Sequence, residues 1–73
     1  MDYSKMLFER FGTALLTTKQ VSTVTGRSVA SLEADRRHGE GVEFKRVGGK
    51  ANSPVRYPLH SISKFLNTVE QIA

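Results

Sequence analysis

The sequence predicts a mainly α-helical fold class with a small β-hairpin. Three observations indicate it: segments with large apolar residues at helical spacing, a glycine after each of the first three of them, and one stretch of strand-forming residues around a Gly/Asn/Ser loop. The chain of 73 residues has the length of one domain and contains no linker, repeat or low-complexity tract. We therefore expect a single domain over residues 1–73.

The first expected element is a short amphipathic helix within an N-terminal extension, residues 1–12. Its large apolar residues form one stripe, which consists of Tyr3, Leu7 and Phe11, widened by Met6 and Phe8. Gly12 is the stop signal. We expect this stripe to pack against the last helix of the chain. The alternative is that part of it stays exposed as a contact for another copy or for a partner protein.

A second helix of about two turns is expected next. Thr17 and Gln20 have the spacing of a capping box, in which each side chain bonds the other residue's backbone N–H. Val21 and Val24 face one way, and Gly26 ends the helix.

A third helix follows closely, with Ser28 as its N-cap and Gly39 as its stop. Val29 and Leu32 mark its inner face. Arg36 falls on that same side, so we expect its stem to cross the core and its head to reach a phosphate or an acid.

The expected hairpin spans residues 44–57. The segments "VEFKRV" and "PVRY" carry β-branched and aromatic residues on either side of the loop, and Pro54 begins the return strand. Its tip is long, since residues 51–54 extend it.

A closing helix is expected from Leu59 onward. Its apolar residues recur at i, i+3, i+4 and i+7, and they are Ile62, Phe65, Leu66 and Val69. Ser61 is its expected cap, and Ile72 is a second candidate for an exposed contact.

The expected order is helix, helix, tight turn, helix, hairpin, helix. Two short helices joined by a glycine-containing turn form a helix-turn-helix unit, and a hairpin directly after the second makes it winged. We therefore predict a winged helix-turn-helix with an extra N-terminal helix and a C-terminal helix.

The stretch from Leu15 to Leu66 resembles the small winged-helix proteins of the excisionase and AlpA group, relatives of the DNA-binding domain of MerR-type regulators. The markers of the resemblance are Leu16-Thr17, Gly26, Gly39, Val47-Gly48, Arg56-Tyr57 and Phe65-Leu66. The extra helix at 3–12 and the longer tip at 51–54 depart from the family pattern. The resemblance implies double-stranded DNA binding, either as a recombination directionality factor that works with an integrase or as a small transcriptional regulator of a mobile element.

It also implies where DNA would be contacted. On the third helix, the face away from Val29 and Leu32 is short-chained and would lie in the major groove, and the candidate contacts on it and at its edges are Arg27, Ser28, Ala30 and Ser31. The other candidates on this helix are Arg36, which reaches out from the inner side, and Arg37, which points off the flank toward the DNA backbone. The candidates on the wing and for the DNA backbone are Lys19, Lys45, Arg46, Gly49, Lys50 and Arg56. For each cation, ordinary solvated surface is the alternative.

The charge pattern agrees with a polyanionic partner. The net charge is +4, and the hairpin residues 45–56 contain four cations and no acid. Binding by one small domain predicts further copies on adjacent DNA sites or a partner such as an integrase.

Other classes of function find little support in the sequence. There is no cysteine, so neither disulfides nor cysteine-ligated metal sites are expected. His38 and His60 stand alone, "VGGK" lacks the spacing of a phosphate loop, and no cofactor or catalytic residue is predicted. No apolar run has membrane-spanning length, which favours a cytoplasmic protein that does not bind membranes. The rival to DNA binding is an antirepressor-like interaction module that binds a regulator or integrase, with Glu33, Asp35 and Glu40 near its contact helix.

Overall fold

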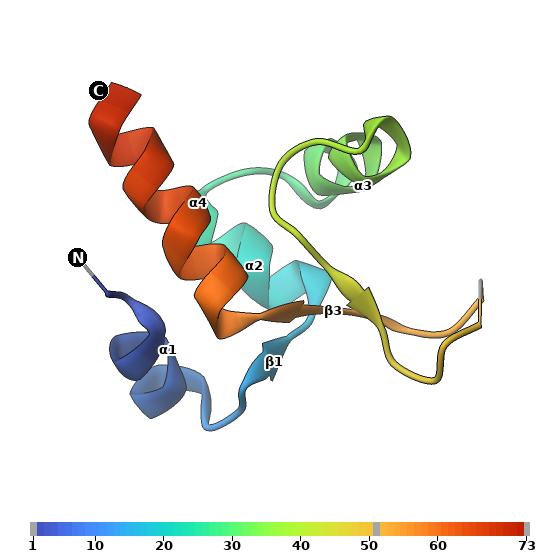
Figure 1. The fold of residues 1–73 in the computed structure, drawn as a ribbon, viewed down its shortest axis with the longest axis horizontal. Coiled ribbons are helices and arrows are strands. Elements are labelled where there is room, and N and C mark those ends of the chain that lie inside the picture. Colours follow the sequence, from blue (N-terminus) through green and yellow to red (C-terminus); the bar gives the residue numbers. More distant parts are fainter. Residues whose placement is uncertain (1, 51, 73) are drawn as a thin grey trace.

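A computed structural model describes residues 2–50 and 52–72 of the chain, with residues 69–72 described by their backbone only. The helices are α1 (Ser4–Phe11), α2 (Thr18–Thr25), α3 (Val29–His38) and α4 (Leu59–Ile72), and the strands are β1 (Leu15–Leu16), β2 (Lys45–Arg46) and β3 (Val55–Pro58) (Figure 1). The described residues form a small domain with four helices and a β-hairpin. The predicted order of helices and hairpin is therefore confirmed. None of these helices has the length and hydropathy that would let it cross a bilayer.

The three strands form one antiparallel sheet in the order β1-β3-β2. The pairing of β2 with β3 is the predicted hairpin, in which Lys45 lies opposite Arg56. The pairing of β1 with β3 was not predicted, and it places Leu16 opposite Tyr57. As a result the chain after α1 and the base of the hairpin are held side by side.

The core draws on every helix and on the sheet. Its buried apolar side chains are Leu7, Leu16, Val21, Leu32, Val42, Tyr57, Leu59 and Ile62. They come from all four helices, from β1 and β3 and from the segment before β2, so the core depends on these elements being docked together.

Helix α1 packs against α4, as the apolar stripe predicted. Leu7 is buried, and Tyr3 and Phe11 pack partly buried against the core. The stripe is narrower than predicted, because Met6 and Phe8 are 55% and 52% exposed. The side of α1 that packs on the core is thus a single line of residues four apart, Tyr3, Leu7 and Phe11.

Polar contacts also join the start of α1 to α4. The Tyr3 N–H donates to the Ser63 hydroxyl over 2.9 Å, and Ser63 lies within 3.5 Å of the Asp2 carboxylate. The Ser4 N–H donates to the same carboxylate and, with the Ser63 contact, holds the pKa of Asp2 below its usual value. These contacts orient the first helix on the last one.

The predicted start and stop signals of α2 and α3 are confirmed. The Thr17 hydroxyl accepts from the Gln20 N–H, and the Gln20 side chain accepts from the Thr17 N–H, which completes the capping box. Ser28 caps α3 by accepting from the Ser31 N–H. Gly26 ends α2 with φ of +77°, a left-handed conformation that allows the abrupt turn into α3.

Three details of the prediction were wrong or lie outside the described part. Val29 is 37% exposed, so Leu32 rather than Val29 anchors the inner face of α3. Helix α4 begins at Leu59, directly after β3, so Ser61 is a buried residue of its first turn and not a cap. The side chains of Val69 and Ile72 lie outside the described residues, as does Ala51 of the hairpin tip.

Candidate nucleic-acid interface

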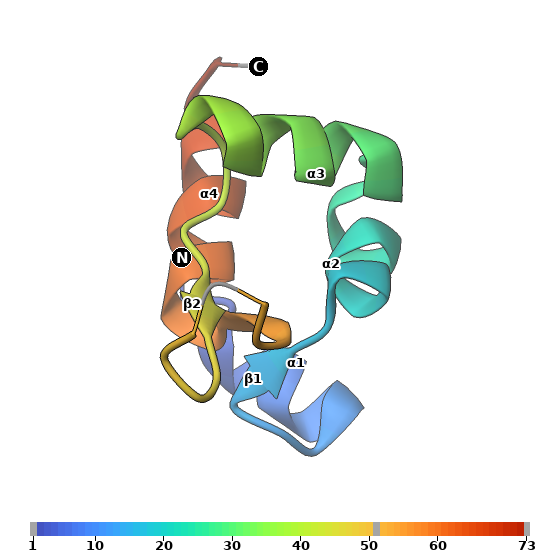
Figure 2. The ribbon, with the colours of Figure 1, turned by 90° about the vertical axis from the view of Figure 1, so that its right-hand side faces the viewer.

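Helix α3 and the tip of the β2–β3 hairpin project from the same side of the molecule. In Figure 1 both lie on the right, while α1 and α4 lie on the left, and Figure 2 shows that side face-on, with α3 crossing above the hairpin. Helix α2 is joined to α3 by the turn at residues 26–28. The surface formed by α3 and the hairpin contains most of the predicted contact residues.

The first predicted contact residue, Arg27, is held against α3 by an ion pair. Its guanidinium donates to the Asp35 carboxylate over 2.8 Å, and the two side chains are only 39% and 18% exposed. The Arg27 Nε is buried and has no hydrogen-bond partner among the described residues. Arg27 thus lies along one flank of α3, with its charge already matched.

The two serines predicted beside Arg27 bond each other. The Ser28 hydroxyl donates to the Ser31 hydroxyl over 3.0 Å while it accepts the Ser31 N–H. Ser31 is partly buried, whereas Ser28 is exposed. Both are therefore parts of the N-terminal cap of α3.

Arg36 lies between α3 and the base of the hairpin. Its guanidinium donates to the Tyr57 hydroxyl over 2.6 Å and to the Thr18 hydroxyl over 3.2 Å, and it lies 5.8 Å from the centre of the Phe44 ring. The stem crosses the core edge as predicted, but the partners of the head are hydroxyls and aromatic rings instead of an acid. Arg36 therefore fixes how α3 sits relative to the sheet.

The outer side of α3 is open to solvent. Its exposed residues are Val29, Ala30, Glu33, Arg37 and His38. Of these, Ala30 and Arg37 were predicted contact residues. Glu33 was predicted only as surface charge, or as part of the rival interaction surface.

The hairpin carries its cations in two different ways. Lys45 and Lys50 are exposed, and none of the described residues forms an ion pair with either. Arg46 donates to the Ser53 carbonyl over 3.2 Å and lies 5.8 Å from the centre of the Phe44 ring, and Arg56 donates to the Val55 carbonyl over 2.8 Å. The lysines are thus free to meet a ligand, while Arg46 also joins the two arms of the hairpin and Arg56 bonds within its own strand.

The tip of the hairpin is tied by short-range hydrogen bonds. The Gly49 N–H donates to the Arg46 carbonyl over 3.2 Å, and the Lys50 N–H donates to the Ser53 hydroxyl over 3.2 Å. Gly48 and Gly49 have φ of +109° and +73°, which side chains rarely adopt. The predicted contact at Gly49 is therefore a backbone position on an exposed turn.

Lys19, the remaining predicted backbone contact, is exposed in the first turn of α2. Its neighbour Thr18 bonds Arg36, so the start of α2 is linked to α3 through that contact. Lys19 itself has no ion pair among the residues that the structure describes.

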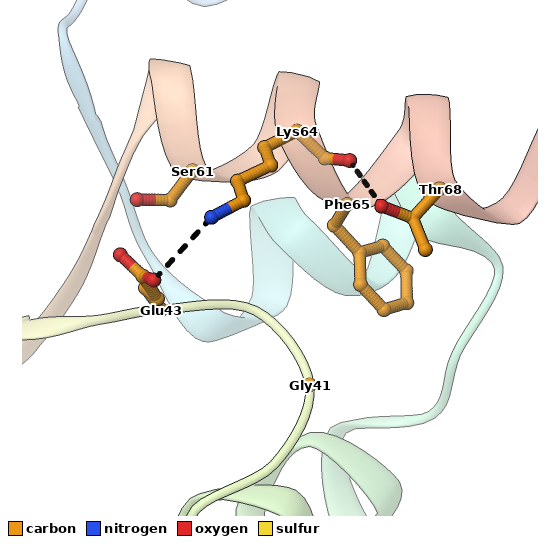
Figure 3. Close-up of a pocket in the computed structure, with 6 residues that line it drawn as sticks. All are labelled: Gly41, Glu43, Ser61, Lys64, Phe65 and Thr68. Carbon is orange, nitrogen blue, oxygen red and sulfur yellow. Dashed lines mark hydrogen bonds and ion pairs between the residues drawn. The ribbon is translucent and has the colours of Figure 1, made fainter.

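A hollow of about 310 Å³ lies between residues 41–43 and α4 (Figure 3). Glu43 and Lys64 face each other across it at 4.0 Å, but both side chains are more than 70% exposed, so this ion pair contributes little stability. Phe65 and Thr68 line the α4 side of the hollow together with Lys64, and Gly41 and Glu43 line the facing side, as Figure 3 shows.

No metal site was predicted, and within the described residues no group of three or more His, Asp or Glu side chains could hold a metal ion. His38 and His60 are both exposed.

The residues that sequence reasoning missed are those that organise the surface from within. Asp35 could not be paired with Arg27 from helical spacing, because Arg27 lies before the N-cap Ser28 and so outside the helix. The Tyr57 hydroxyl and the Phe44 ring offered no signal either, since both approach Arg36 from distant parts of the chain. No family model, curated protein or solved structure matches the chain.

Proposed function

We propose that this protein binds double-stranded DNA as a winged helix-turn-helix domain, with α2 and α3 as the helix-turn-helix and the β2–β3 hairpin as the wing. The observation that carries the proposal is the shared orientation of α3 and the basic hairpin tip (Figure 2). Such an arrangement lets a helix enter the major groove while the wing reaches the neighbouring phosphates.

The charges of the hairpin support a polyanionic ligand. Lys45 and Arg56 are register partners on adjacent antiparallel strands. Like charges placed directly opposite each other destabilise such a pair of strands. Phosphates would neutralise both charges, so the pair of cations favours DNA binding although it does not favour folding.

The outer side of α3 suits a groove. Ala30 and Ala34 are small, and Arg37 is exposed in its last turn, where a cation can meet a phosphate. The major groove is about 12 Å wide and admits an α-helix whose outward side chains are short.

The biological role that fits this proposal is that of an excisionase-like directionality factor or a small transcriptional regulator, as the sequence resemblance implies. The molecule measures 33 Å in its longest dimension, close to one turn of B-DNA. One chain therefore covers a short site, and useful affinity requires further copies on adjacent sites or a partner such as an integrase. An integrase gene next to the gene of this protein would favour excision over transcriptional control.

A salt series tests the proposal. Fluorescence anisotropy with a labelled duplex should show affinity that falls steeply between about 50 and 200 mM salt, with a slope of about 0.9 per phosphate contacted. Absence of binding to specific or unrelated duplexes at the lowest salt would overturn it, and would favour a protein-interaction module instead.

A further inference from the structure

We propose that Glu33 reads a cytosine in the major groove, an inference that rests on the proposed DNA binding. It begins from the two flanks of α3, which meet different neighbours. Arg36 contacts Phe44 and Tyr57 at the base of the hairpin, so its flank faces the hairpin. Asp35 belongs to the other flank, which is closed by Arg27 and by the segment around Gly41.

Glu33 belongs to the flank that faces the hairpin. Residues three and four apart are neighbours on a helix surface. The neighbours of Glu33 are therefore Val29 and Ala30 in the preceding turn and Arg36 and Arg37 in the following one. Asp35 has Ser31 and His38 as its corresponding neighbours, so the two carboxylates are on different flanks.

The Glu33 carboxylate also has no partner among the described residues. Asp35 and Glu43 both form ion pairs, whereas Glu33 is exposed and has no ion pair or side-chain hydrogen bond with any of the described residues. A free acid on a surface that meets phosphates costs affinity unless a donor group faces it. A donor group on the DNA would offset that cost.

The chemistry of the major groove selects cytosine as that donor. Cytosine presents its N4 amino group there, and Glu and Asp accept from it. Adenine also presents an amino group, but the N7 acceptor beside it repels a carboxylate. Val29 and Ala30 have no acceptor in their side chains, so Glu33 is the acceptor of this flank.

The test compares the wild type with Glu33→Ala and with Glu9→Ala, which removes the same charge from the exposed side of α1. Duplexes selected from a random pool by the wild type should share a cytosine at one position. Glu33→Ala should lose the preference for cytosine at that position and keep the preferences at all other positions. Its affinity for the selected duplex should fall about fivefold or more, which is the discrimination expected of one good base contact. Glu9→Ala should keep the preference and the affinity.

A modified base separates direct contact from an indirect effect. N4-methylcytosine at the selected position places a methyl group where the groove-facing hydrogen was. It should weaken wild-type binding about fivefold or more and leave the binding of Glu33→Ala unchanged. Circular dichroism melts of both variants verify the fold, since both residues are exposed.

Two results would overturn the assignment while leaving DNA binding intact: a cytosine preference that persists in Glu33→Ala, or tighter binding of this variant to selected and random duplexes alike, as expected of an acid that only repels phosphates. If the wild type binds no duplex at low salt, the proposed function fails, and the role of Glu33 fails with it.

Discussion

The Arg36 guanidinium donates to the Tyr57 hydroxyl over 2.6 Å and so links α3 to the central strand of the sheet. Tyr57 is buried, and a buried hydroxyl without a partner is costly. The contact therefore satisfies a core residue and sets the position of α3 relative to the hairpin. An apolar residue at position 36 could fill the same space, but it could not bond both Tyr57 and Thr18.

Tyr57→Phe should lower the free energy of unfolding by about 1–2 kcal/mol, because it removes a hydrogen bond that involves a charged group. Tyr3→Phe is the matched control, since the Tyr3 hydroxyl has no hydrogen bond among the described residues. Urea denaturation measures both. Equal stability of the two variants would show that the Arg36 contact adds nothing.

Local signals were predictable from the sequence, because the residues that form them lie close together in the chain. The Thr17–Gln20 capping box and the turn at Gly26 are of this kind. Strand β1 was not predictable, since Leu15 and Leu16 are too few to show an alternating pattern and their partners lie far along the chain in β3.

The candidate interface, too, could be predicted from the sequence only in part. The exposed lysines of the hairpin were found from charge alone. Arg27 could be placed next to α3 but not paired with Asp35, and its expected contact with bases meets competition from that ion pair. The exposure of Val29 depended on how α3 is rotated, which the distant contacts of Arg36 decide.

Leu7→Ala should destabilise the domain by about 2–4 kcal/mol, because Leu7 is the buried residue through which α1 packs on the core. Met6→Ala, next to it on the same helix, removes a side chain that is 55% exposed and should cost less than about 1 kcal/mol. Thermal and urea unfolding give both values. If the two substitutions cost the same, α1 is not part of the core, and removal of residues 1–12 would then leave the melting temperature unchanged.

Gly41→Ala should be more destabilising than Gly49→Ala. Both glycines have positive φ, which costs an alanine about 1–2 kcal/mol. A Cβ at Gly41 would also lie 2.7 Å from the Asp35 Oδ2, whereas nothing lies within 4 Å of one at Gly49. The excess should become smaller when Asp35→Ala is added, because that substitution removes Oδ2 and Cγ and leaves only the Cβ at 3.0 Å. An undiminished excess in this double-mutant cycle would place its cause elsewhere.

Lys50→Ala should weaken DNA binding equally on specific and random duplexes, because a lysine at an exposed turn contacts phosphates and not bases. The slope of log K against log salt should fall by about 0.9, the contribution of one phosphate contact. Lys5→Ala is the matched control, since it removes the same charge from an exposed position on α1. The free energy of unfolding should stay within about 0.5 kcal/mol for both variants. If Lys50→Ala and Lys5→Ala leave the same salt slope as the wild type in a protein that binds DNA, Lys50 does not contact a phosphate. If the triple substitution Lys50→Ala, Arg46→Ala and Arg56→Ala also leaves affinity and slope unchanged in a folded protein, the wing does not contact DNA.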